Sequence, residues 1–350
     1  MIPNSKRVFY FEYLPHAVYT EIMGGRADVK LDRLEYAALP DANWATIQTA
    51  HAYQITAASG DLPAEFFADA AFLERCPNLL MVSSHGVGYD TIDVDACTAA
   101  GVAVLNQAGG NAEGVAEHVM AMMLCLSKRL IEVDRVMRRE AGINRNTFIG
   151  NNIEGKTIGI VGLGHIGSRV SELCRGLFGM RVLAVDPYLS ADEIAACGAE
   201  KTDLGSLFAT ADVVSINCPL TAETRGMVAA PLLARMKPTA FLVVTARGGI
   251  VDEAALAAAL AEKRIAGAGL DVWEPEPPSL SHPLLAFDNV VSSPHTAGIT
   301  HESRRNIATI AAEQVLATLD GERPPRLVNP EVWQRFKERY AAAFGQPLKM

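Results

Sequence analysis

The fold is decided by the stretch Thr157–Gly167, which reads Thr-Ile-Gly-Ile-Val-Gly-Leu-Gly-His-Ile-Gly. Its apolar first half predicts a strand, and the pattern Gly-x-Gly-x-x-Gly then leads into a predicted helix. In that pattern Gly162 permits a tight turn, Gly164 lets backbone approach a pyrophosphate, and Gly167 lets the helix pack closely on the sheet. The first N–H groups of the helix point at the phosphates, so the stretch predicts a dinucleotide site.

A carboxylate stands where the second half of such a site requires one. Asp186 ends another apolar run, Arg181–Asp186, 19 residues after Gly167. At the tip of a strand it would accept hydrogen bonds from the ribose hydroxyls and repel a 2′-phosphate. The spacing therefore predicts NAD rather than NADP. The plainer interpretation, in which Asp186 only caps the turn beside Pro187, stays open.

Composition narrows the class of protein. The chain has 350 residues, of which 49% are hydrophobic and 20% charged, values typical of a globular protein with room for two domains. Its net charge of −9 argues against nucleic acid or an anionic membrane as partner, but leaves room for a small anion in a local basic pocket. No apolar run approaches the ~18–20 residues of a membrane span, and no signal peptide is evident. The six cysteines form no Cys-x-x-Cys pair, so we expect reduced thiols, a cytoplasmic protein and no metal site.

Strand-like and helix-like segments alternate before the glycine loop. This alternation predicts a parallel sheet with helices on both faces. The predicted strands are Arg7–Tyr13, Val29–Leu34, Tyr53–Ala57, Leu79–Ser84 and Val102–Leu105, and the predicted helices are Trp44–Ala50, Ala64–Cys76 and Asp93–Ala100.

A second alternating region follows a break at Gly109-Gly110 and a helical pattern from Ala112 to Arg139. Its strands after the glycine loop are predicted at Val213–Asn217, Ala240–Thr245, Gly267–Val272 and Val290–Ser292, and a last helix at Ile299–Leu319. We therefore expect an α/β protein with two doubly wound parallel-sheet domains, joined by two long helices, with an active cleft between them. The predicted boundaries give a discontinuous substrate domain, residues 1–111 plus 299–350, and a dinucleotide domain, residues 112–298.

Three titratable residues follow successive strands of the second region. They are Arg247, Glu276 and His295. Because the carboxyl ends of parallel strands share one edge, we expect the three to converge there. A guanidinium grips a carboxylate, an imidazole exchanges a proton with a hydroxyl group, and a neighbouring carboxylate orients the imidazole. The alternative for each is an ordinary residue of a surface loop.

Several motifs in order resemble the D-isomer-specific 2-hydroxyacid dehydrogenase family, over most of the chain. They are Gly86–Asp93, Asn111–His118, Gly155–Gly159 with the glycine loop, Cys218–Thr224, Ala246–Asp252, Gly269–Val272, Glu276–Pro277 and Pro294–His295. The resemblance implies two domains of the Rossmann-like or flavodoxin-like kind. It also implies hydride transfer between NAD(H) and a D-2-hydroxy or 2-oxo acid, in a homodimer formed through the nucleotide domain.

The resemblance also implies a role for each matching residue. Arg247 would bind the substrate carboxylate, together with the backbone of Val87 and Gly88, and His295 would be the acid/base with Glu276 as its partner. Asp271 would hold the nicotinamide carboxamide. The implied cofactor site comprises Gly162, Gly164, His165, Ile166, Gly167, Asp186, Cys218, Pro219, Thr224, Thr245, Ala246, Asp271 and His295.

Other residues and activities leave alternatives open. His85 either enters the substrate pocket or is a polar turn residue, Asn111 either contacts substrate or caps a helix, and His118 is interpreted as a helix-face residue. The segment Ile55–Gly60 lacks the arginine expected for a phosphorylated substrate, and the family's formate enzymes carry an amide where Glu276 stands. The rivals are a nucleotide-sensing protein of the corepressor type and a phosphite or other small-acid dehydrogenase. The acid itself, the direction and the strictness for NAD stay open.

Overall fold

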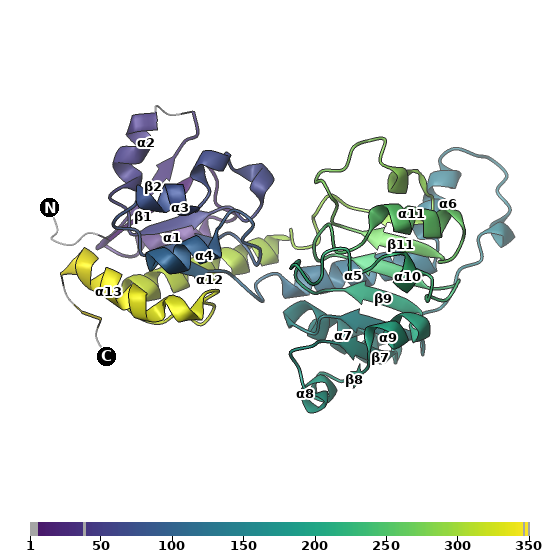
Figure 1. The fold of residues 1–350 in the computed structure, drawn as a ribbon. Helices are drawn as coiled ribbons and strands as arrows, with labels where there is room; N and C mark the ends of the chain where they lie inside the picture. The colour runs from purple at the N-terminus through teal and green to yellow at the C-terminus, as the bar shows by residue number, and fades with distance from the viewer. Residues whose placement is uncertain (1–5, 38–39, 346, 349–350) are drawn as a thin grey trace. The chain divides into compact units, whose positions relative to one another are not determined.

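The computed structural model describes residues 6–37, 40–345 and 347–348. Its contacts divide the chain into two compact units, each of which is an α/β structure (Figure 1). Unit 1 comprises Met1–Asn111 and Thr300–Met350, and unit 2 comprises Ala112–Ile299. The chain therefore passes from one unit to the other twice, each time just before a long helix begins.

Unit 1 is built on a five-stranded parallel sheet with the order β2-β1-β3-β4-β5. Every neighbouring pair is parallel, so each connection must cross over one face of the sheet, and helices make these crossings. The strands are β1 (Lys6–Phe11), β2 (Val29–Leu34), β3 (Ala52–Ile55), β4 (Met81–Ser84) and β5 (Ala103–Leu105).

Successive side chains of these strands enter two separate cores, as the two-residue period of a strand requires. Phe9 and Tyr53 stack with their ring centroids 4.3 Å apart on one face, whereas Val8 lies on the other. The helices are α1 (Val18–Gly24), α2 (Pro40–Ile47), α3 (Ala70–Glu74), α4 (Val94–Ala100), α12 (His301–Leu319) and α13 (Trp333–Phe344), with short 3-10 turns η1 (Ser59–Asp61), η2 (Ala64–Phe66) and η5 (Pro330–Val332). Both C-terminal helices pack on the face that contains Val8.

Unit 2 is built on a seven-stranded parallel sheet with the order β12-β11-β10-β9-β6-β7-β8. The chain builds outward from β6 in one direction and then from β9 in the other, so the strand order reverses between β6 and β9. Ligands of such sheets bind at this switch point, outside the carboxyl ends of the strands. The strands are β6 (Thr157–Val161), β7 (Arg181–Val185), β8 (Glu200–Lys201), β9 (Val213–Ile216), β10 (Phe241–Val244), β11 (Gly267–Leu270) and β12 (Val290–Ser292).

Helices cover both faces of this sheet. Two buried cores result, one containing α5 and α7 residues and the other α9 and α11 residues. The helices are α5 (Ala112–Ser127), α6 (Leu130–Met137), α7 (His165–Phe178), α8 (Ala191–Ala196), α9 (Leu204–Thr210), α10 (Ala230–Leu233) and α11 (Glu253–Ala261), with η3 (Arg145–Thr147) and η4 (Pro283–Ala286). The fold class predicted from the sequence, two parallel-sheet α/β structures, is confirmed.

The prediction of a single helix from Ala112 to Arg139 is wrong. The segment forms α5 and α6, separated by Arg129 in the left-handed region with φ of 52°. The guanidinium of Arg129 donates hydrogen bonds to the carboxylate of Glu132 and to the carbonyl of Thr147. These contacts hold a backbone conformation that a non-glycine residue adopts only at a cost.

Two further helix predictions need correction. The segment Ala64–Cys76 contains η2 and α3 rather than one helix, because Ala68 pairs with Ile92 in a parallel bridge and Asp69 then caps α3. The helix that ends at Leu319 is also not the last one. Helix α13 follows it and buries Phe336 and Tyr340 in a core of unit 1.

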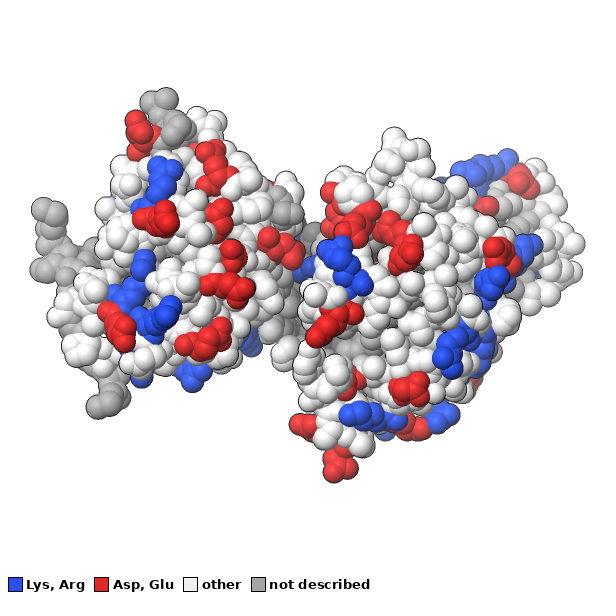
Figure 2. All heavy atoms as spheres, in the orientation of Figure 1, with Lys and Arg blue, Asp and Glu red and all other residues white. Residues whose placement is uncertain are grey.

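The surface carries both signs of charge. On the face drawn in Figure 2, Lys and Arg side chains lie interspersed with Asp and Glu rather than forming one basic field. Within the described residues, no helix is both long and apolar enough to cross a membrane. The same part of the chain holds no group of three or more His, Cys, Asp or Glu side chains suited to a metal ion.

Candidate active site

The glycine loop leaves β6 at the switch point of unit 2. Gly162 has φ of +88°, and a Cβ there would lie 2.8 Å from the backbone nitrogen of Cys218, so only glycine fits. A Cβ on Gly167 would collide with the carbonyl oxygen of Gly162, which explains how α7 packs so close to the turn. A Cβ on Gly164, in contrast, would meet no protein atom within 4 Å. Of the three glycines, Gly164 is therefore the one with an open side.

The N-terminus of α7 lies directly behind this open side. Gly164 is the N-cap of the helix, and both Gly164 and His165 are exposed. Ile166 is half-buried and packs into the core of unit 2. The exposed first turn of a helix of this length offers N–H groups to an anion, which fits the predicted pyrophosphate position.

Asp186 connects the end of β7 to the glycine loop. Its Oδ2 accepts a hydrogen bond from the N–H of Leu163 at 2.9 Å, and its Oδ1 accepts one from the N–H of Tyr188 at 3.0 Å. Both interpretations of this residue are compatible with these bonds. The carboxylate does cap the turn after β7, and it stands beside the loop where the ribose was predicted.

Two more loops border the switch point. After β9, Thr224 closes a tight turn by donating its hydroxyl proton to the carbonyl of Pro219 at 2.7 Å. Cys218 is buried, and burial raises the pKa of its thiol to about 11, so the thiol stays protonated near neutral pH. After β10, the Oγ1 of Thr245 is buried without a hydrogen-bond partner in the described chain, and Ala246 follows it.

His295 and Glu276 form a hydrogen-bonded pair beyond β12 and β11. The Nδ1 of His295 lies 2.8 Å from Oε2 of Glu276, and Oε1 of Glu276 accepts the N–H of Trp273 at 2.9 Å. Burial raises the pKa of Glu276, but the hydrogen bonds from His295 and Trp273 and the nearby charges of His295 and Arg247 outweigh it. The pKa of Glu276 therefore lies below its ordinary value, and the carboxylate is ionised at neutral pH.

Arg247 lies at the same edge of the sheet, in the loop after β10. Its guanidinium donates a hydrogen bond to the carbonyl of Ala246 at 2.8 Å, and its charge contributes to the lowered pKa of Glu276. The next residue, Gly248, lets this loop approach the carbonyl of Trp273 closer than any side chain would allow. The structure thus places Arg247, Glu276 and His295 at one edge of the sheet.

Asp271 directly follows β11 and contacts the loop that carries His295. It is fully buried, and its carboxylate accepts hydrogen bonds from Ser293 Oγ at 2.6 Å, Thr296 N–H at 2.8 Å and Ala297 N–H at 3.0 Å. Its own carbonyl accepts the N–H of His295 at 2.6 Å. Asp271 therefore fixes the backbone on both sides of His295, and its contact with nicotinamide stays a prediction.

The predicted substrate residues of unit 1 lie at the carboxyl end of its sheet. The carbonyl of Val87 accepts a hydrogen bond from Asn106 at 3.0 Å, and that of Gly88 accepts one from Ser84 at 2.5 Å, so the loop is held by its carbonyl groups. Burial lowers the pKa of His85 to about 3, and its Nε2 is buried without a partner in the described residues. The Oδ1 of Asn111 is likewise buried and accepts no hydrogen bond there, so it does not act as a helix cap.

Sequence reasoning missed one residue of this edge. His118 faces the sheet from α5, with its Nε2 2.9 Å from Ser293 Oγ and 3.8 Å from Asp271 Oδ1. Its interpretation as a helix-face residue is correct, but the face is the one that meets the site. The signal was present in the four-residue spacing of His118, Met122 and Leu126, which puts the histidine on the buried stripe of the helix.

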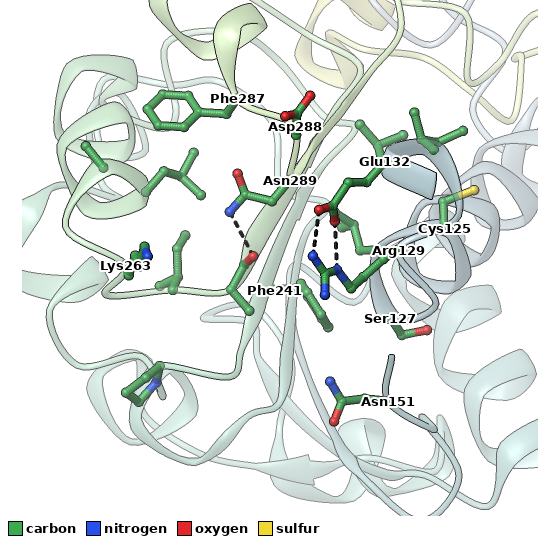
Figure 3. A pocket seen from close by; sticks show the side chains of 18 residues that line it. Cys125, Ser127, Arg129, Glu132, Asn151, Phe241, Lys263, Phe287, Asp288 and Asn289 are labelled. Atoms are coloured by element: carbon green, nitrogen blue, oxygen red, sulfur yellow. Dashed lines mark hydrogen bonds and ion pairs between the residues drawn. The ribbon is translucent and has the colours of Figure 1, made fainter. Parts of the chain in front are cut away.

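A cavity of about 530 Å³ lies at the opposite edge of the same sheet. Its lining includes Phe241, which begins β10, Val291 within β12, and the ion pair of Arg129 with Glu132 (Figure 3). Asn289 also lines it and donates to the carbonyl of Ala266. Because it adjoins the amino ends of the strands, this cavity is separate from the edge that carries His295.

Comparisons with known proteins are consistent with this geometry. Residues 120–297 match the family model described as "D-isomer specific 2-hydroxyacid dehydrogenase, NAD binding domain". The chain is 42% identical to a glyoxylate reductase of Korarchaeum cryptofilum, over 75% of this chain and 80% of that protein. It is 40% identical to a D-3-phosphoglycerate dehydrogenase of Archaeoglobus fulgidus over 72% of this chain, but it covers only 48% of that longer protein.

Solved structures resemble more than nine-tenths of the chain. A glyoxylate reductase from Paecilomyes thermophila superposes with a TM-score of 0.81 at 25% identity, covering 93% of this chain and 99% of the other. An NAD-complexed D-isomer specific 2-hydroxyacid dehydrogenase from Lactobacillus delbrueckii gives 0.77 at 26% identity, covering 93% and 100%.

Proposed function

Because the chain belongs to the D-isomer specific 2-hydroxyacid dehydrogenase family, we propose that it interconverts a D-2-hydroxy acid and its 2-oxo acid, with NAD(H) as cofactor. The observation that carries this proposal is the His295–Glu276 pair, 2.8 Å apart, at the same strand edge as Arg247. This is the set of groups that the chemistry requires, a proton donor with an orienting carboxylate beside a carboxylate-binding guanidinium.

In the proposed reaction, Arg247 binds the substrate carboxylate, and the backbone of Val87 and Gly88 contributes from the other domain. Glu276 holds the Nδ1 side of His295, so the proton of Nε2 is directed at the substrate oxygen. His295 donates that proton to the ketone oxygen during reduction and removes it during oxidation. When bound, NADH supplies the hydride. We propose residues 112–298 as the dinucleotide domain and residues 1–111 plus 299–350 as the substrate domain.

The cofactor site that we propose uses the open side of Gly164 for the pyrophosphate and Asp186 for the ribose. Its carboxylate is oriented by the N–H groups of Leu163 and Tyr188, and a 2′-phosphate would meet its negative charge. We therefore propose a preference for NADH over NADPH. Cys218, Pro219, Thr224, Thr245 and Ala246 border the same switch point and complete the proposed site.

The substrate that we propose is a small, unphosphorylated 2-oxo acid. Glyoxylate reductases and phosphoglycerate dehydrogenases are both among the similar proteins. The segment Ile55–Gly60 contains no arginine or lysine to hold a phosphate, which favours the first kind of activity.

The test is oxidation of NADH by the purified protein against a panel of glyoxylate, hydroxypyruvate, pyruvate and bulkier 2-oxo acids, with NADPH in parallel. Turnover of a small acid with NADH would support the proposal and name the substrate. Tight NADH binding without turnover of any acid would contradict it and favour a nucleotide-sensing role. NAD-dependent oxidation of phosphite in place of 2-oxoacid reduction would contradict it differently, by changing the reaction.

We also propose a homodimer formed through unit 2. Helix α6 buries none of its residues, and Leu130, Met137 and Ile149, which lie on or after it, are 57%, 67% and 76% exposed. Exposed large apolar side chains are typical of a subunit contact. Sedimentation should give twice the chain mass, and the double variant Leu130→Glu/Met137→Glu should give the monomer. Leu177→Glu, which changes an exposed leucine on α7, is the matched control and should leave the dimer intact.

The cytoplasmic location that we propose rests on the six cysteines, all of which are free thiols.

A further inference from the structure

Helix α5 lies directly on β11, and glycines set the distance between them. A Cβ on Gly269 would lie 2.9 Å from Sδ of Met122, and one on Gly267 would lie 3.2 Å from Cδ2 of Leu126. Met122 comes before Leu126 in the helix, whereas Gly269 comes after Gly267 in the strand. The helix therefore runs antiparallel to the strand, with contacts every four helix residues and every two strand residues.

This register can be extended by one step. Four helix residues advance about 6 Å, and two strand residues advance about 6.6 Å, so the two spacings match closely. One step before Met122 is His118, and one step beyond Gly269 is Asp271. The observed distance of 3.8 Å between His118 Nε2 and Asp271 Oδ1 agrees with this register. The position of His118 is thus a consequence of the small residues in β11.

Three side chains then form a directed chain of hydrogen bonds. Ser293 Oγ lies 2.6 Å from Asp271 Oδ1 and 2.9 Å from His118 Nε2. A carboxylate only accepts and a hydroxyl group has one proton, so Ser293 donates to Asp271 and accepts the Nε2–H of His118. The proton of a neutral His118 is thereby fixed on Nε2.

This chain ends at the backbone of His295. Asp271 accepts the N–H groups of Thr296 and Ala297, and His295 itself has φ of 56°, in the left-handed region. A non-glycine residue holds such a conformation only where its surroundings determine it. Glu276 orients the ring of His295, whereas Asp271 orients its backbone.

We propose that His118 is a positioning residue, which acts through Ser293 and Asp271 to hold the His295 loop in the conformation needed for proton transfer. The proposal rests on the function proposed above for His295. In this proposal α5 contributes to the reaction through His118, although His118 does not contact the substrate.

The first test compares variants that keep the hydrogen bond with variants that remove it. His118→Leu and Ser293→Ala should each lower kcat by about 10- to 100-fold with little change in KM, because a displaced acid/base group loses alignment. His118→Gln, whose amide can donate from a similar position, and Ser293→Thr, which keeps the hydroxyl group, should restore most of kcat. Losses equal in the conservative and the disruptive variants would contradict the proposal.

The second test asks whether the two residues act as one chain. The double variant His118→Leu/Ser293→Ala should be no slower than the slower single variant, because either change already breaks the same link. If the loss of kcat in the double variant equalled the product of the two single losses, the residues would act independently. That result would contradict the proposed chain of hydrogen bonds.

The third test needs no turnover, so it separates this proposal from the function on which it rests. In His118→Leu and Ser293→Ala, hydrogen exchange should accelerate in a peptide that covers residues 293–299, while a peptide of β10 stays protected. Unchanged exchange at residues 293–299 would overturn the proposal even in an active enzyme. If the wild-type protein reduced no 2-oxo acid but the two variants still showed this local acceleration, the proposed function would fail, whereas the role of His118 and Ser293 in holding the His295 loop would stand.

Discussion

The carboxyl edges of the two sheets differ in how their polar groups are satisfied. In unit 2, the charged groups are paired in advance, His295 with Glu276 and Asp271 with three donors. In unit 1, the Oε1 of Gln54, the Nε2 of His85 and the Oε1 of Gln107 are buried without partners in the described residues. Buried polar atoms are almost always hydrogen-bonded, so an unsatisfied group needs a reason. Both edges thus contain neutral polar atoms without a partner in the described residues, such as Oγ1 of Thr245 in unit 2, but only the edge of unit 2 also holds paired charged groups.

Of the changes predicted here, removing the proton donor of unit 2 should have the largest effect on activity. His295→Ala should lower kcat for reduction by ~10²–10⁴-fold, the usual contribution of general acid catalysis, while NADH still binds. The matched control is His282→Ala, which breaks a similar pair, 2.9 Å from Glu253, elsewhere in unit 2 and should keep most of the activity. Near-wild-type turnover of the His295 variant would contradict the assignment of His295 as the proton donor.

Changing the carboxylate-binding group should have a smaller effect. Arg247→Lys keeps the charge but loses the planar fork, so kcat/KM should fall by about 10- to 100-fold, equivalent to the loss of one charge-assisted hydrogen bond. Glyoxylate has few groups besides its carboxylate and its carbonyl. Steady-state kinetics with this acid would therefore report on the contact between Arg247 and the carboxylate. A lysine variant as efficient as the wild type would show that Arg247 acts only through its charge.

The comparison is sharpened in unit 1 by His85→Leu. The wild-type imidazole is neutral at any working pH because burial lowers its pKa to about 3. Losing one neutral hydrogen bond should reduce kcat/KM by about 2- to 10-fold for acids with a hydrogen-bonding group at C3, such as hydroxypyruvate. Glyoxylate lacks that group and serves as the control within the same variant. Equal losses for both acids would mean that His85 does not contact the substrate side chain.

The smallest effect concerns stability and pH. The folded pKa of Glu276 is lowered, so its ionised form stabilises the fold above the ordinary glutamate pKa, and this contribution is lost as pH falls through the folded pKa. Glu276→Gln should therefore cost stability at pH 7 and progressively less towards acid pH. Because the pair is partly exposed, we expect a difference below about 1 kcal/mol, from urea unfolding at several pH values. A difference that grew on acidification would contradict the sign of this shift.

Much of unit 2 could be predicted because its signals are local. Gly167 is required by a contact within one strand–turn–helix, with the carbonyl oxygen of Gly162, so the spacing of the glycines carried this information. Gly162 has a positive φ in the same turn, although the backbone that it approaches, at Cys218, is distant in sequence. The positions of Arg247, Glu276 and His295 follow from strand ends that sequence periodicity locates within about two residues. The family and the NAD cofactor, predicted from motifs of this kind, are confirmed.

The parts that sequence did not predict depend on distant partners. No glycine or proline marks the break between the two helices at Arg129. The hydrogen bond that supports this break joins Arg129 to the carbonyl of Thr147, 18 residues away. The bridge from Ala68 to Ile92 splits a segment whose local pattern is helical. His118 could be placed on a buried stripe, but its contact with Ser293 spans 175 residues and needs the register of α5 on β11.

The division of unit 1 between the two ends of the sequence has a consequence for its synthesis. Its strands leave the ribosome first, but α12 and α13, which cover Val8, Leu80 and Met81, are made only after residues 112–299. At ordinary elongation rates that interval lasts roughly 10–40 s, during which unit 2, being continuous, can fold. The first strands of the chain thus spend this time without their cover, an interval in which a chaperone that recognises bare apolar strands would find its target.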